Sequence, residues 1–161
     1  MHKCFHDSPQ MLAELVVRMR GRDAELIDLL NHKVSRNVFK KHLVEMHGEE
    51  SLHFFDEATT FESTYKTMSK KEIIERAKTI IDRFLVANAN ETVNVSHEIF
   101  NKAQLLLREN QFTPGMFDDA IKEIYILMER DLFQRFKKSD TFSNLLVQIR
   151  SYDDLDKELL A

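Results

Sequence analysis

The sequence predicts an all-α fold. Three glycines and two prolines in 161 residues leave little turn chemistry for a many-stranded sheet. Long stretches instead carry apolar residues at spacings of three and four, which is the pattern of amphipathic helices. Because 43% of the residues are hydrophobic and no linker or low-complexity tract interrupts them, the chain can bury a core of ordinary size. We therefore expect a single bundle of about nine helices.

Four helices are expected before residue 69. Their ranges are 11–20, 24–31, 36–46 and from Glu49 or Glu50 to about 68. Gly21 and Gly48 lie between these ranges, where glycine commonly ends a helix because it adopts left-handed backbone angles without strain.

The next helix begins at a capping box, Ser69-Lys70-Lys71-Glu72. In this motif the Ser hydroxyl and the Glu carboxylate each accept a backbone N–H that the first helical turn leaves unpaired. The helix is expected to reach about Val86, and a polar connection over 88–94 follows.

Two further helices are expected from their N-caps. Ser96 is expected to cap a helix to about Glu109, and Ser139 or Asp140 to cap one to about 149. Residues 151–161 form an acidic, amphipathic tail.

The segment 113–139 carries the strongest helix signals. Thr113 is expected to cap a helix whose first position is Pro114, and Asp118 and Asp119 lie near the positive end of its dipole. Apolar residues then recur at spacings of three and four, which predicts a buried stripe of Ile121, Ile124, Tyr125, Met128, Leu132 and Phe136.

A second stripe on this helix is formed by Leu127, Asp131 and Arg135, which stand four residues apart. This spacing places them along one edge beside the buried face, and an Asp four residues before an Arg can form an ion pair with it. From spacing alone, the simpler interpretation is a solvated helix edge, because most helix ion pairs have no other role.

Five blocks of sequence resemble a regulator of G-protein signalling (RGS) domain. They occur in the family's order and spacing. They are LLNH at 29–32 with FKKHL at 39–43, EESLHFFDEA at 49–58, AKTII at 77–81 with FL at 84–85, TVNVS at 92–96, and TPxxFDxAxxEIxxLMExD followed by xxRFxKS in 113–139. The resemblance implies an RGS domain at 26–149, an N-terminal helical extension at 1–25 that packs on the bundle, and a C-terminal tail at 150–161.

The resemblance also implies a function. It predicts a GTPase activator that binds the transition-state form of a heterotrimeric G-protein α subunit (Gα), holds its switch regions and accelerates GTP hydrolysis, without a catalytic site or cofactor of its own. The Gα-binding positions that match the family's motifs are Glu50, Ser51, Asn94, Leu127, Asp131 and Arg135.

Some of these positions carry a more specific expectation. Asn94 falls where the family places the side chain that reaches into the switch region, although an Asn before a helix cap can also be a turn residue. Asp131 corresponds to the acceptor for switch I, and Arg135 to the residue that steadies it. Ser51 and Phe55 depart from the family's usual Asn and Trp. Ser51→Asn is therefore expected to tighten Gα binding by about one hydrogen bond.

Composition and motifs argue against several other functions. The formal net charge of −4 is unlike the basic footprint of a nucleic-acid-binding protein. No apolar run approaches the roughly 18 residues that span a bilayer, and no signal peptide or glycine-rich phosphate loop is present. His2, Cys4 and His6 alternate like metal ligands but lack a fourth partner, so no metal site is expected.

We expect a cytoplasmic monomer that is recruited to the inner face of the plasma membrane through Gα. Two alternatives remain open. The first is a scaffold of the same fold that binds Gα or another partner without accelerating hydrolysis. The second is a helical enzyme with its own site, against which the missing set of nucleophile, base and orienting residue argues.

Overall fold

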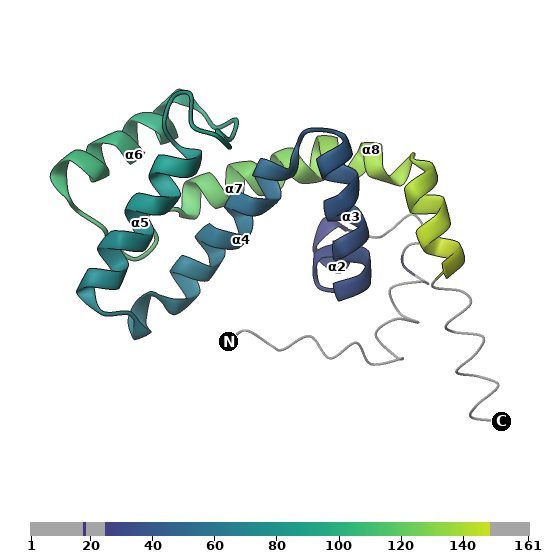
Figure 1. The fold of residues 1–161 in the computed structure, drawn as a ribbon, viewed down its shortest axis with the longest axis horizontal. Coiled ribbons are helices and arrows are strands. Elements are labelled where there is room, and N and C mark those ends of the chain that lie inside the picture. The colour runs from purple at the N-terminus through teal and green to yellow at the C-terminus, as the bar shows by residue number, and fades with distance from the viewer. Residues whose placement is uncertain (1–17, 19–24, 149–161) are drawn as a thin grey trace. The chain divides into compact units, whose positions relative to one another are not determined.

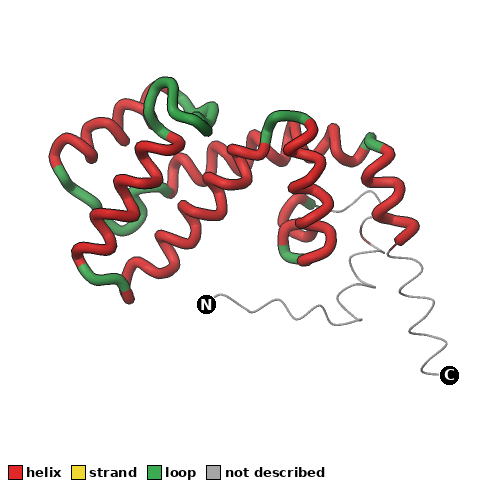
Figure 2. Tube along the Cα trace, viewed as in Figure 1, coloured by secondary structure: helices red, strands yellow, loops and turns green. Residues whose placement is uncertain are grey.

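The computed structural model describes residue 18 and residues 25–148, and every regular element in them is helical (Figures 1 and 2). The all-α prediction is confirmed. The expected helix 11–20, apart from the helical residue Arg18, lies outside the described residues. So do the metal-ligand candidates His2, Cys4 and His6, most of the extension 1–25, and the tail.

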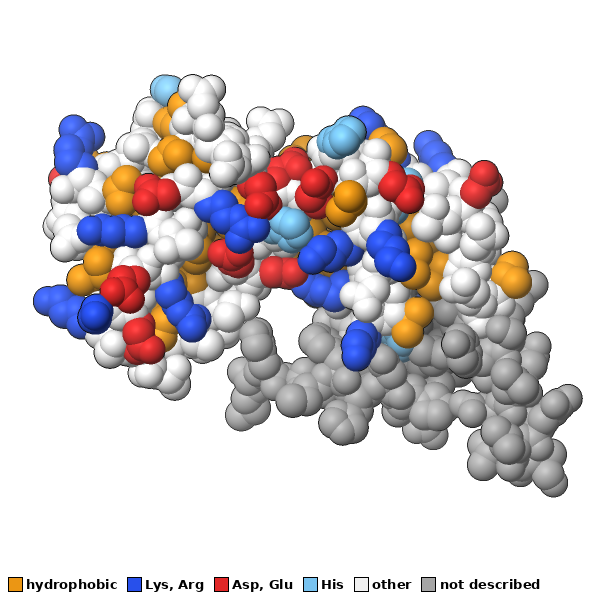
Figure 3. All heavy atoms as spheres, in the orientation of Figure 1, with side chains coloured by type: hydrophobic (Ala, Val, Ile, Leu, Met, Phe, Trp, Pro, Cys, Tyr) orange, Lys and Arg blue, Asp and Glu red, His pale blue; other side chains and the backbone are white. Residues whose placement is uncertain are grey.

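The chain separates into two compact units. Among the described residues, one unit comprises 47–128 and the other comprises 18, 25–46 and 129–148. On the face drawn in Figure 3, acidic and basic side chains are interspersed in both units.

The first unit contains the helices α4 (Glu49–Thr64), α5 (Lys70–Phe84), α6 (His97–Glu109) and α7 (Asp118–Leu127), with a short 3₁₀ turn at Tyr65–Thr67. Its core is aromatic, as the apolar stripes predict. Phe54 lies 5.6 Å from Phe84, and Phe117 lies 5.3 Å from Phe61, between ring centroids in edge-to-face geometry. All four rings are at most 2% exposed, so they pack the interior and cannot serve as a base-stacking surface.

The second unit contains α2 (Leu26–Leu30), α3 (Lys33–Glu45), α8 (Phe133–Lys137) and a last helical stretch at 140–148. Phe136 is the centre of its core, with ring centroids 5.2 Å from Phe39 and 5.3 Å from Phe142. Ser139 caps the last stretch as expected, because its hydroxyl accepts the N–H of Phe142 at 3.2 Å.

The capping box at the start of α5 is confirmed. The Ser69 hydroxyl accepts the Glu72 N–H at 3.3 Å, and the Glu72 carboxylate accepts the Ser69 N–H at 2.8 Å. Both contacts lie within four consecutive residues, which is why sequence alone could predict them.

The predicted start of α7 at Thr113 and Pro114 is wrong, because the helix begins at Asp118. Gly115 adopts φ +77°, a left-handed conformation that a right-handed helix cannot contain. Glu62 of α4 holds this turn by accepting the N–H groups of Gly115 at 2.6 Å and Phe117 at 3.1 Å. A carboxylate more than fifty residues away thus replaces the expected local cap.

The predicted buried stripe is correct at Ile124, Met128 and Phe136. It is wrong at Ile121, Tyr125 and Leu132, which are only partly buried. Residues Met128–Leu132 form a π-helix, in which one extra residue enters the turn. The buried position therefore moves from Leu132 to Phe133, which is 1% exposed and five residues after Met128.

Candidate functional site

Asn94 is exposed on the connection between α5 and α6. The backbone on both sides of it is held. The N–H of Val93 donates to the carbonyl of Phe84 at 3.0 Å, and the Val93 side chain is 4% exposed. The N–H of Val95 donates to the carbonyl of Val93 at 3.2 Å, which closes a tight turn across Asn94.

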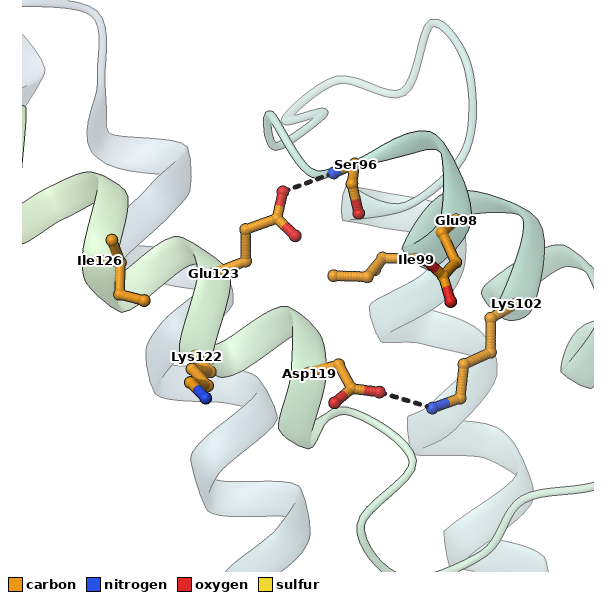
Figure 4. Close-up of a pocket in the computed structure, with 8 residues that line it drawn as sticks. All are labelled: Ser96, Glu98, Ile99, Lys102, Asp119, Lys122, Glu123 and Ile126. Atoms are coloured by element: carbon orange, nitrogen blue, oxygen red, sulfur yellow. Dashed lines mark hydrogen bonds and ion pairs between the residues drawn. The ribbon is translucent and has the colours of Figure 1, made fainter.

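The following residue is also held. The N–H of Ser96 donates to the Glu123 carboxylate of α7 at 2.6 Å, as Figure 4 shows. Ser96 precedes α6 as predicted, but its side chain makes no capping hydrogen bond. Contacts to α5 and α7 thus fix the ends of a short segment whose central side chain points to solvent.

A groove of about 450 Å³ lies between α6 and α7, beside Ser96. Figure 4 shows the residues that line it. Lys102 and Asp119 form an ion pair of 2.8 Å within it. The lining also contains Lys122, Glu98 and Glu123, so basic and acidic side chains both face the groove and its charge alone selects neither an anion nor a cation.

Glu50 lies in the first turn of α4, where a negative charge complements the helix dipole. Partial burial raises its pKa, and the negative charges of Glu49 and Glu91 raise it further. Three residues later, His53 Nδ1 lies 2.6 Å from Glu91 Oε2. This contact joins α4 to the connection that carries Asn94, so the fold brings Glu50 and Asn94 into one region of the first unit.

Ser51 is also on α4, but it is only 2% exposed. In this conformation its side chain offers almost no surface to a partner. Phe55, the other departure from the family pattern, is partly buried and packs on Tyr125 with ring centroids 5.9 Å apart. The ring therefore packs between α4 and α7.

Leu127 is the last residue of α7 and is partly exposed. In the second unit, Arg135 Nε donates to Asp131 Oδ1 at 2.8 Å, and the two side chains are 58% and 45% exposed. Asp131 lies in the π-helix and Arg135 in α8, so the predicted ion pair forms across the irregular turn. Both side chains remain accessible.

Four polar residues that contact or support the Asn94 connection were not predicted from sequence: Glu57, Arg83, Glu91 and His53. Glu57 and His53 lie on one stripe of α4 with Glu50, at spacings of three and four. That spacing could have indicated a polar face, but nothing local to Arg83 or Glu91 indicates their partners.

Within residue 18 and 25–148, no helix is long and apolar enough to cross a membrane. The same residues contain no cluster of three or more His, Cys, Asp or Glu side chains with metal-binding geometry.

Comparison with known proteins identifies the family. The family described as "Regulator of G protein signaling domain" matches residues 25–145. Regulator of G-protein signaling 1 of Xenopus tropicalis is 32% identical over 117 residues, which cover 73% of this chain and 56% of that protein. Regulator of G-protein signaling 8 of Homo sapiens is 30% identical over 144 residues, which cover 88% of this chain and 77% of that protein.

The chain therefore belongs to the RGS domain family. Regulator of G-protein signaling 5 of Sus scrofa is similar to it as well, with 31% identity over 128 residues that cover 80% of this chain and 67% of that protein. The chain spans between about half and two thirds of the length of several of these relatives.

Proposed function

We propose that this protein is a GTPase activator for heterotrimeric Gα subunits. Gα carries its transition-state arginine in cis and its own water-orienting glutamine, so its partner need not supply an arginine finger. What a partner can supply is order in the switch loops. Holding those loops in the geometry of in-line attack lowers the barrier by positioning and electrostatic preorganisation.

The proposal depends mainly on one observation, that Asn94 has an exposed side chain on a hydrogen-bonded stretch of backbone. Its backbone is hydrogen-bonded at Val93 and Val95, the next N–H is bound by Glu123, and its side chain is exposed. A side chain that orients a catalytic glutamine must itself be held in place before the partner arrives, because ordering it on binding would reduce the gain in rate. The backbone contacts support this role because they hold the turn from which the Asn94 side chain projects.

Five of the six candidate contacts fit a role at the partner surface. Glu50 and Asn94 are proposed to touch the switch loops, and Leu127 to make an apolar contact. Asp131 is proposed to accept hydrogen bonds from switch I while Arg135 holds its carboxylate in place. Ser51 is proposed to act indirectly, through the packing of α4, because its side chain is buried.

We further propose that the protein acts as a monomer on the inner face of the plasma membrane, where Gα resides. Fractionation of cells that do and do not express membrane-anchored Gα would test this. Recovery of the protein with membranes only when Gα is present is the expected result, and recovery independent of Gα would contradict it.

The decisive experiment is a single-turnover assay on a panel of GTP-loaded Gα subunits. We expect faster loss of GTP with at least one of them. Binding should also depend on the nucleotide that Gα carries. A partner complementary to the transition state binds most tightly to Gα loaded with a mimic of that state. GDP with aluminium fluoride should give the tightest complex. Equal affinity for the GDP form and the fluoride form would contradict the proposal.

A second candidate function is binding to Gα without acceleration. It is favoured by one observation, that residue 51, where the resemblance predicts an Asn, is a Ser whose side chain is buried. The two candidates differ in the same assay. Tight binding to the fluoride-loaded Gα with an unchanged rate of GTP loss would support the scaffold.

A further inference from the structure

The connection that carries Asn94 is bound to two helices through one carboxylate. Glu91 Oε2 lies 2.6 Å from His53 Nδ1 of α4. Glu91 Oε1 accepts from Arg83 Nε at 3.0 Å and from Arg83 Nη2 at 2.6 Å, on α5. The Arg83 guanidinium also donates to Glu57 of α4. We call these four residues the Glu91 network.

The network has the geometry of a rigid support. Arg83 contacts Glu91 through two nitrogens, and such charge-assisted contacts restrict orientation more than a single hydrogen bond does. The Glu91, His53 and Arg83 side chains are 27%, 25% and 36% exposed, so the contacts are partly shielded from water. Although partial burial opposes ionisation, the hydrogen bonds from His53 and Arg83 lower the pKa of Glu91, so its carboxylate is charged at neutral pH.

The network and the backbone contacts act on the same short segment. Glu91 is three residues before Asn94, and Val93 between them is hydrogen-bonded to Phe84, the neighbour of Arg83. The single hydroxyl proton of Thr92 is shared between the carbonyls of Val86 and Ala89, at 3.2 and 3.1 Å. Release of Glu91 would remove the only contacts in this set that reach α4, and would leave the Asn94 turn attached to α5 and α7.

We propose that Glu91, held by His53 and Arg83, is a positioning residue for the GTPase-activating action: it fixes the turn that presents Asn94 to the Gα switch region. This inference rests on the proposed function. It concerns a residue that does not itself touch the reacting atoms.

The first test measures rate against protein concentration in single-turnover GTP hydrolysis by Gα. Glu91→Ala is expected to lower the saturating rate about tenfold, because a loosened turn no longer holds Asn94 in the productive geometry. The half-saturating concentration should change less than about threefold, since ground-state contacts elsewhere persist. Glu91→Gln should stay within about threefold of wild type, because the amide can accept from Arg83 and donate to His53 Nδ1.

The second test asks whether Glu91 acts through Asn94. In an Asn94→Ala background, Glu91→Ala should lower the saturating rate less than about twofold, because residues that act as one unit are not additive. Asp119→Ala is the matched control. It breaks the 2.8 Å ion pair with Lys102 between α6 and α7, which does not contact the turn, and it should leave the rate unchanged.

The third test needs no Gα activity. Amide hydrogen exchange of Val93 and Val95 should accelerate in Glu91→Ala while the core helices keep their protection. Arg83→Gln removes the guanidinium contacts of Glu91 on the α5 side and leaves the His53 contact in place, and it gives an independent variant should Glu91→Ala not fold.

The outcomes are separable. Additive losses in the double variant, or a wild-type saturating rate in Glu91→Ala, would overturn the positioning role. A wild-type protein that accelerates no Gα would overturn the proposed function and with it the catalytic role of Glu91. Unchanged exchange at Val93 and Val95 would show that Glu91 does not order the turn in any case.

Discussion

The two proposed contact regions present their side chains in different ways. Asn94 lies in irregular backbone that three hydrogen bonds and a partly buried charge network hold in place. Asp131 lies on helical backbone, and the structure supports it through one ion pair whose side chains are 45% and 58% exposed. The first region depends on the surrounding fold for its geometry, whereas the second is largely self-contained.

This difference predicts different roles at a Gα surface. A side chain on backbone that is held in advance loses less entropy on binding and can act on the transition state, so Asn94 should influence the rate. An accessible ion pair contributes little until a partner excludes water from it, so Asp131 should influence affinity. Mutations in the two regions should therefore separate the rate from the affinity.

Asp131→Ala should produce the largest effect, a loss of about 2 to 5 kcal/mol in binding to fluoride-loaded Gα, because it truncates one partner of a desolvated charge contact. Its effect on folding should be only about 0.3 to 0.5 kcal/mol, the value of an exposed helix pair. Titration by calorimetry and thermal denaturation measure the two quantities. Glu75→Ala is the control, since it breaks another i,i+4 pair, with Lys71, on α5. Wild-type affinity in the Asp131 variant would make this edge a solvated face.

Asn94→Ala should lower the saturating rate of GTP hydrolysis by the equivalent of about 1 to 3 kcal/mol, the cost of one aligned polar contact in a desolvated site. Its melting temperature should hardly change, because the side chain is exposed. A single-turnover assay and a melting curve suffice. If both the rate and the melting temperature matched wild type, Asn94 would be a turn residue only.

Ser51→Asn tests the buried position at which this chain carries Ser in place of the family's usual Asn. The sequence predicts tighter Gα binding from an added amide, but the 2% exposure of Ser51 leaves the amide little room. We expect destabilisation on the order of 1 kcal/mol from overpacking, with Gα affinity unchanged or reduced. Urea denaturation and titration against Gα distinguish these effects. Tighter binding by a variant of normal stability would mean that residue 51 reaches the partner.

The two smallest predicted effects are pH dependences, and the first comes from Glu91. Its pKa is lowered in the folded protein, so the unfolded chain takes up a proton first as pH falls. Relative to Glu91→Gln, the wild type should therefore gain less than about 1 kcal/mol of stability at pH 7 and lose this advantage as the pH falls below about 4. Denaturation at a series of pH values measures it.

For Glu50, the predicted change in stability with pH has the opposite sign, and Glu50→Gln tests it. Burial raises the pKa of Glu50, so its ionisation costs stability in the folded protein as pH rises through that raised value. The wild type should be slightly less stable than Glu50→Gln at pH 7, and the difference should disappear in acid. The same trend with pH in both variants would show that the two carboxylates do not differ in environment.

The sequence by itself determined the class of fold, the order of the helices and the cap at Ser69. Each of these depends on residues within about two helical turns of one another, where spacing and capping rules apply. It also identified the residues that match the family, including Asn94, Asp131 and the ion pair with Arg135. The pair was predictable because an i,i+4 contact is set by helix geometry alone, and the π-turn did not prevent it.

Only the tertiary structure decided the features that depend on distant residues. The Glu62 carboxylate determines that α7 begins after Gly115, although Thr113 and Pro114 are good local helix starters. Likewise, the position of Phe133 in the core reflects a π-turn that a constant helical period does not contain. The Glu91 network joins partners up to 38 residues apart, so no local pattern encodes it. In each case a long-range contact of favourable free energy outweighs a local preference of a fraction of a kcal/mol to about 1 kcal/mol per residue.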